Sequence, residues 1–394
     1  MTVRHLTETV PAWVEATQET AEPIVSRQCT ALRNLSDFVF PEHCSDDERR
    51  AIESRIVRAL KQCPAIPDGH YYSVSDMNGT ALRLLAERRL ITYDLLYAQG
   101  PRGVYISDDQ CLAVMVNAMD HVTIRATVSD GDFDSTWALV DRVDEALGGL
   151  LNFTFHERLG YLTSALRTVG TGLKLCALLH LPALAMSGRM HEMETRVTDK
   201  RLLLRGIGLG DPRCADSATS IAPALCSLTP DMESVSAQSF FLDVLGDLSA
   251  PVTHSAGNLF LLSNQDTLGL SERELIIHVE QALSDLVQQE EKTRQRLLRE
   301  QRNALLDCFG RALGLARGAR LLNLREAYQY ASLIRLADAM RLIAGCDRVA
   351  LGRALLECQQ AHLQLMRDVP MEASGMCAER ARIFRSLFTG TDIN

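Results

Sequence analysis

The feature that most limits how this chain can fold is a change in its hydrophobic pattern at about residue 275. In "ELIIHVEQALSDLVQQEEKTRQRLLREQRNALLDCFGRAL" (274–313), apolar residues recur at spacings of three and four, which is typical of helices with one buried face. Shorter helical patterns follow at 324–344, 347–367 and 376–388. Because no strand pattern interrupts them, the sequence predicts a separate, all-helical C-terminal domain over residues 276–394.

The middle of the chain instead mixes strand and helix patterns. "RGVYISDD" (102–109) and "CLAVMVNAMDHVTIRATV" (111–128) are rich in aliphatic and β-branched residues and meet at an Asp-Asp turn, which predicts an antiparallel hairpin. "RLLLRGIGLG" (201–210) predicts a further strand. Helices are predicted over 134–151 and in "GLKLCALLHLPALAM" (172–186).

These patterns give a first domain plan of the α+β class. Helical patterns at 46–63 and 77–92 predict a small, mainly helical N-terminal region over residues 1–95. Residues 96–275 then form a domain of strands and helices. Within it, 211–254 is rich in Ser, Ala, Asp and Pro and has weak periodicity, so an inserted loop is predicted there.

Composition excludes several classes of protein. The net charge of −9 argues against a nucleic-acid binder, which would carry a basic surface. The N-terminal residues are broken by charges, so no signal peptide is predicted, and the longest apolar run (175–186) is too short for a membrane span. The eleven cysteines lack a CxxC pair or zinc-ligand spacing, so we expect no metal site and no disulfide. A cytoplasmic protein is the default expectation.

Several segments occur in an order and spacing that chance does not readily produce. They are "LRNL" (32–35), "VMVNAMDHVTI" (114–124), "ERLGYLTSALRTVGTGLK" (157–174), "HLPAL" (180–184), "RGI" (205–207) and "GNLFLLSNQDTLGLSE" (257–272). Together they resemble the phosphagen (ATP:guanido) kinase family, and most closely its bacterial branch, the protein arginine kinases. With the helical C-terminal region, the resemblance covers nearly the whole chain.

The resemblance implies a fold and an activity. It implies a curved antiparallel sheet flanked by helices, and the transfer of the γ-phosphoryl group of Mg-ATP to a guanidinium nitrogen. In protein arginine kinases the guanidinium belongs to an arginine of a protein, and the product marks clients for degradation. A small zinc-binding adaptor, a protease chaperone or an active kinase are the implied protein partners, and the C-terminal domain is implied to form a homodimer.

The phosphate-binding positions of the family are mostly changed in this chain. Family arginines that hold the triphosphate correspond to Gln28, Thr30 and Thr123, and a family histidine corresponds to Asp94. A fourth arginine has become Lys174, which keeps the charge but loses the bidentate fork. The fifth is retained as Arg205. Two further cations, Arg125 and Arg167, are candidates for displaced phosphate contacts.

The catalytic carboxylates are also absent from their positions. The paired glutamates of the family fall on Ala118 and Met119, and a substrate-contacting glutamate falls on Gly210. A methionine thioether cannot take a proton or bind a guanidinium with useful strength. Asp120 is adjacent but belongs to an Asp-His pair of the family, and we expect it to point away. His121 and His180 are predicted to be structural.

Two further family features are altered. The reactive cysteine corresponds to Ala165. A phosphoarginine pocket ahead of the last helix corresponds to Met376 and Cys377, so packing and dimerisation are the expected roles of that region.

Three functional hypotheses follow. The first is a pseudokinase that works by binding and regulation in protein quality control. The second is an active arginine kinase that uses Arg125, Arg167, Lys174 and Arg205 in a rearranged site. The third is a module that senses ATP without transferring phosphate, so Mg-ATP is the cofactor only if a nucleotide binds. Since phosphoryl transfer depends on positioning and charge neutralisation, the losses favour the first hypothesis.

Overall fold

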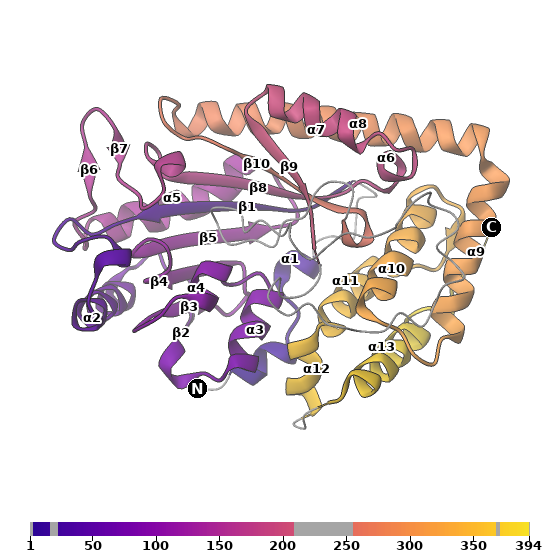
Figure 1. Ribbon diagram of the computed structural model, residues 1–394, viewed down its shortest axis with the longest axis horizontal. Coiled ribbons are helices and arrows are strands. Elements are labelled where there is room, and N and C mark those ends of the chain that lie inside the picture. The colour runs from indigo at the N-terminus through magenta and orange to yellow at the C-terminus, as the bar shows by residue number, and fades with distance from the viewer. Residues whose placement is uncertain (1–2, 16–22, 209–254, 368–370, 394) are drawn as a thin grey trace.

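The computed structural model describes residues 3–15, 23–208, 255–367 and 371–393. The predicted loop at 211–254 and Gly210 lie outside these residues. Eight strands form one antiparallel sheet, in the order β2 (Gly69–Ser73), β3 (Gly103–Ser107), β4 (Leu112–Val116), β5 (Val122–Val128), β1 (Ile24–Arg33), β8 (Leu173–His180), β10 (Leu259–Asn264) and β9 (Leu202–Gly206). The predicted antiparallel sheet with flanking helices is therefore confirmed (Figure 1).

Local predictions succeeded where the sequence pattern was unambiguous. The hairpin is confirmed as β3 and β4, which pair from Gly103 with Val116 to Ile106 with Ala113. The helix predicted over 172–186 is wrong: residues Leu173–His180 form β8, and only Pro182–Met186 (α6) is helical. A continuous apolar run fits a strand buried on both faces as well as a buried helix.

The described elements within 1–95 are mostly helical, but the region also contributes to the sheet. It supplies β1, which lies between β5 and β8, and the edge strand β2. In β1 the residues alternate between the two faces of the sheet, with Cys29 and Ala31 on one face and Gln28 and Thr30 on the other. The proposed domain boundaries themselves stay a prediction.

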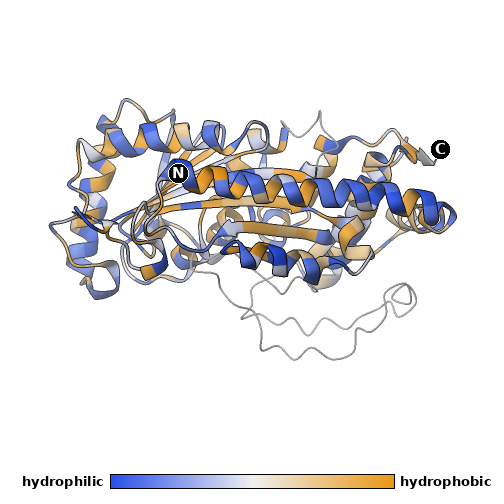
Figure 2. Cartoon of the chain, turned by 90° about the horizontal axis from the view of Figure 1, so that it is seen from above, coloured by the Kyte–Doolittle hydropathy of each residue, from blue (hydrophilic) through white to orange (hydrophobic). Residues whose placement is uncertain are grey.

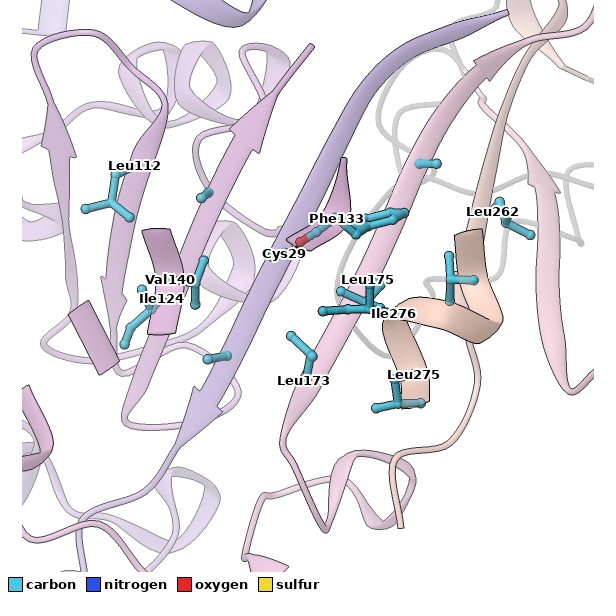
Figure 3. Close-up of a cluster of buried hydrophobic side chains, with 14 of the residues drawn as sticks. Cys29, Leu112, Ile124, Phe133, Val140, Leu173, Leu175, Leu262, Leu275 and Ile276 are labelled. Atoms are coloured by element: carbon cyan, nitrogen blue, oxygen red, sulfur yellow. Dashed lines mark hydrogen bonds between the residues drawn. The ribbon is translucent and has the colours of Figure 1, made fainter. Parts of the chain in front are cut away.

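One face of the sheet carries the main hydrophobic core. Three helices cover it: α2 (Asp46–Gln62), α5 (Phe133–Gly148) and α8 (Glu272–Glu300), with α7 (Met190–Asp199) beside the β9 edge. Figure 3 shows Phe133 and Val140 of α5 and Ile276 of α8 near the inward residues of β1, β5 and β8. In Figure 2 the strands are mostly hydrophobic, while hydrophilic and hydrophobic residues alternate along the covering helices.

The other face is covered only in part by apolar packing. Helices α3 (Gly79–Glu87) and α4 (Tyr93–Tyr97) pack on β3 and β4 through Val104, Ile106 and Met115. The short elements are η1 (Val3–Thr7), α1 (Ala12–Glu15), η3 (Pro41–His43), η4 (Val74–Asp76), β6 (Phe155–His156), β7 (Gly160–Tyr161), η5 (Leu166–Thr168) and η8 (Ala256–Asn258).

The C-terminal helices have a core of their own. They are α9 (Arg302–Gly318), α10 (Leu324–Ala339), α11 (Arg348–Glu357), α12 (Gln360–Arg367) and α13 (Ala373–Leu387). The region is mostly rather than entirely helical, because β11 (Ile343–Ala344) pairs with β12 (Asp392–Ile393). At the start of α8, Ser271 and Glu274 form a reciprocal capping box.

Two glutamates join helices that are far apart in the sequence. Glu290 of α8 is fully buried and accepts hydrogen bonds from the backbone nitrogens of Ala183 (3.0 Å) and Leu184 (2.9 Å) at the start of α6. Glu87 of α3 accepts from the backbone nitrogens of Ala361 (2.9 Å) and His362 (3.3 Å) at the start of α12. The helix α12 is thus capped by a carboxylate from a distant part of the chain.

Candidate active site

Polar residues form a row across the middle of the sheet, on the face opposite the main core. Thr30 of β1 pairs with Arg125 of β5 on one side and with Lys174 of β8 on the other. Arg125 donates from Nε to Thr30 Oγ1 at 3.4 Å, and all three residues are at most 4% exposed. The structure therefore brings together two of the predicted cations beside a position where the family has a third.

The next residues along β1 and β5 on the same face are also polar, and their side chains hydrogen-bond to each other. Gln28 donates from Nε2 to Thr127 Oγ1 at 3.0 Å, and both residues are buried. Thr123 is also buried and pairs with Leu32. Gln28, Thr30 and Thr123, which the resemblance matches to family arginines, are therefore all buried, uncharged side chains.

The sequence analysis missed one cation on this face. Arg89 donates from Nη1 to Ser26 Oγ at 3.1 Å, and its backbone has a positive φ of 61°. With Arg88 and Arg125 it lines a tightly packed spot that has no room for a water molecule. Only the tertiary fold brings Arg89 here, since nothing in "ERRLIT" marks it.

The remaining predicted cations lie elsewhere. Arg167 is exposed in η5, and Arg205 lies on the outer strand β9, with Nη1 3.9 Å from Glu194 Oε1 of α7. From strand spacing and register, the Cα atoms of Arg205 and Lys174 are roughly 16 Å apart. Asp94 stands in the first turn of α4, where a negative charge suits the helix N-terminus.

The turn after β4 holds the two positions of the family glutamates. Ala118 is buried, and Met119 is half-buried and bonded through its backbone oxygen to Ser164 Oγ at 2.8 Å. Asp120, the carboxylate of this turn, is fully buried and accepts at Oδ1 from Asn34 Nδ2 (2.6 Å) and from the backbone nitrogen of Ser164 (2.7 Å). These two hydrogen bonds tie Asp120 to Asn34 and Ser164, which indicates a structural role.

Both histidines are structural, as predicted. His121 accepts at Nδ1 from the backbone nitrogen of Leu35 at 3.1 Å, and burial lowers its pKa to about 4. His180 lies 2.8 Å from Ser332 Oγ, and burial lowers its pKa well below the usual value. Both imidazoles are therefore neutral near pH 7.

The altered C-terminal positions lie in α13. Met376 packs against the C-terminal core, and the backbone oxygen of Cys377 accepts from the nitrogen of Leu322 at 3.0 Å. Within the described ranges, no three His, Cys, Asp or Glu side chains are grouped so as to hold a metal ion, and no helix is both long and apolar enough to cross a membrane.

The described part of this face offers cations for a phosphate but no carboxylate at the positions that the resemblance assigns to the paired glutamates. Arg89, Arg125 and Lys174 could attract a phosphate, but the positions that would orient a guanidinium hold Ala118 and Met119. No step of phosphoryl transfer can therefore be derived from the described residues.

Comparison with known proteins identifies the family to which this chain belongs. The sequence model of the ATP:guanido phosphotransferase C-terminal catalytic domain matches residues 51–225 and 238–293, which is more than half of the chain. The chain belongs to this family. Residues 302–393 match the C-terminal domain of the protein-arginine kinase McsB.

Curated relatives and solved structures agree with this assignment. The protein-arginine kinase of Moorella thermoacetica is 29% identical over 387 residues, covering 96% of this chain and 97% of that protein. That of Syntrophomonas wolfei is 28% identical, covering 100% of this chain and 99% of that protein. The crystal structure of lombricine kinase shares the fold, with a TM-score of 0.51 and 18% identity over 72% of this chain and 70% of that chain.

Proposed function

We propose that this member of the ATP:guanido phosphotransferase family is a pseudokinase that acts by binding protein partners. The observation that carries this proposal is the turn after β4. Ala118 and Met119 stand where the family has glutamates, and Asp120 is locked by Asn34 and Ser164. Loss of an acid-base carboxylate costs roughly 10²–10⁴ in rate.

Weakened phosphate binding supports the same proposal. Each charge-assisted hydrogen bond contributes about 1.5–3 kcal/mol, so three missing arginines remove on the order of 4–9 kcal/mol. On the polar face, the side chains of Gln28, Thr30 and Thr123 are tightly packed, since each residue is at most 2% exposed. The two losses together would bring a moderate kinase close to the uncatalysed rate.

The binding role we infer is in protein quality control in the cytoplasm. The partners proposed are an adaptor, a protease chaperone or an active kinase, reached through the C-terminal helices, which also form a homodimer in this proposal. The match of residues 302–393 to the C-terminal domain of a protein-arginine kinase supports this assignment of the helical region.

A second candidate function is nucleotide sensing without transfer. The row of Arg125, Thr30 and Lys174, with Arg89 nearby, favours it because it concentrates cations on the polar face. Such a site would bind a triphosphate but would still lack the carboxylate that orients a guanidinium.

Thermal unfolding with and without Mg-ATP distinguishes these functions. The pseudokinase proposal expects no rise in Tm at millimolar nucleotide. Nucleotide sensing expects a rise of several degrees, since a ligand at 100 times its Kd stabilises by about 2.7 kcal/mol. A rise that Lys174→Ala abolishes, and that the exposed control Lys292→Ala keeps, would contradict the first function, and together with an absence of phosphate transfer it would support the second.

A further inference from the structure

A second hollow lies on the opposite face of the sheet from Thr30. It is a groove of about 570 Å³ beside α5, and the β6–β7 hairpin forms part of its wall. Arg33 lies in its floor because β1 alternates, so this side chain projects toward α5 rather than toward Thr30. The groove is thus separate from the candidate active site.

Carboxylates dominate the charge of this groove. Asp141, Asp144 and Glu145 are spaced three and four residues apart, so they share one face of α5, and Glu272 of α8 lies on another wall. Arg33 is the one basic residue in the lining. Burial raises the pKa of Asp144, the ion pair with Arg33 lowers it, and repulsion from Asp141 and Glu145 raises it further.

Asp144 has an unused acceptor. Arg33 donates from both Nε (3.1 Å) and Nη2 (2.6 Å) to the same oxygen, Asp144 Oδ2. The other oxygen, Oδ1, has no hydrogen-bond partner among the described residues, although Asp144 is 94% buried, being 6% exposed. A buried carboxylate oxygen without a donor is costly, so this atom marks a place where a further N–H would be stabilised.

Aromatic side chains complete the lining. The guanidinium carbon of Arg33 lies 3.5 Å from the ring centre of Tyr161, which shows that the groove already holds one stacked guanidinium. Trp137, Phe153 and Phe155 supply further rings, and Phe155 is 60% exposed. Aromatic faces next to carboxylates favour organic cations.

We propose that the groove beside α5 binds an arginine side chain presented by an extended segment of a partner protein. The planar guanidinium would donate to the carboxylates of Asp141, Asp144 and Glu145 and stack on Trp137 or Phe155. The segment on either side of the arginine would lie on the exposed rim at Phe155. This docking holds whether or not the chain transfers phosphate.

The test is binding of fluorescent nine-residue peptides, followed by anisotropy and by Trp137 fluorescence. One peptide has a central arginine, and its partner has citrulline, which keeps the shape without the charge. The variant Asp141→Asn/Glu145→Gln removes two charges from the groove. The variant Glu291→Gln/Glu300→Gln removes two exposed charges from α8 and is the matched control.

The proposal expects the arginine peptide to bind at least ten-fold more tightly than the citrulline peptide. The groove variant should lose about ten-fold or more of that affinity, the control variant should keep it, and added salt should weaken it. Equal binding of the two peptides, unchanged affinity in the groove variant, or no binding at millimolar peptide would overturn the proposal. If free arginine bound as tightly as the peptide, the groove would recognise the amino acid alone, and the proposed contact with a segment of a partner protein would be wrong.

Discussion

Replacing Arg33 with methionine is expected to lower the free energy of unfolding by about 3–5 kcal/mol, because it leaves the carboxylate of Asp144 buried without its partner. The side chains of this ion pair are 1% and 7% exposed, and Arg33 also donates to the backbone oxygens of Leu32 and Thr171, both at 2.9 Å. Chemical denaturation followed by circular dichroism measures the change.

A matched control exists on the surface. The Arg50–Asp47 pair of α2 has an equally short contact of 2.7 Å, but its side chains are 61% and 91% exposed. Arg50→Met should leave stability nearly unchanged, because water and salt screen exposed pairs. If Arg33→Met were as harmless as Arg50→Met, the buried pair would not support the strand and helix that it joins.

The Glu87 cap should make stability depend on pH. Burial raises the pKa of Glu87 to about 7, from an ordinary value of 4.5. The folded chain therefore binds this proton more tightly than the unfolded chain, so the contribution of Glu87 to stability is greatest below pH 4.5 and is lost as pH rises to about 7. Its full size is on the order of 3 kcal/mol.

The variant Glu87→Gln isolates this effect. Glutamine can still accept from Ala361 but does not titrate, so the unfolding free energy of the native chain relative to the variant should fall between pH 4.5 and 7. The native chain must be compared with the variant because other groups also titrate in this range. Burial lowers the pKa values of His121 and His362 to about 4, so their contribution to stability rises with pH, opposite to that of Glu87. The exposed control Glu291→Gln should show no such difference; a flat difference for Glu87→Gln would contradict the raised pKa.

The sequence allowed much of the fold to be predicted, because motif order and helical periodicity are properties of the chain itself. The hairpin of β3 and β4 and the capping box at Ser271 follow from local residues. The strand β8 was missed because its residues are buried on both faces, so the apolar run lacks a period of two.

The candidate site was predictable only in part. The resemblance named the positions of the expected arginines and glutamates, and their replacement stays a prediction; the structure adds that Asp120 is held by the backbone nitrogen of Ser164. The sequence could not show that Arg89 reaches Ser26, because that contact joins residues 63 positions apart. The groove at Asp144 was likewise hidden, since it combines α5, the β6–β7 hairpin and α8. Contacts of this kind depend on the tertiary fold.

The most direct test of the central claim is transfer of labelled γ-phosphate from Mg-ATP to arginine-rich protein, scored as acid-labile product. The Moorella thermoacetica protein-arginine kinase serves as the positive control. We predict no product above the no-protein control, either for the native chain or for Met119→Glu, because restoring one carboxylate leaves phosphate binding weak. Product from the native chain that Arg205→Ala abolishes would contradict the pseudokinase account and show that catalysis uses other residues.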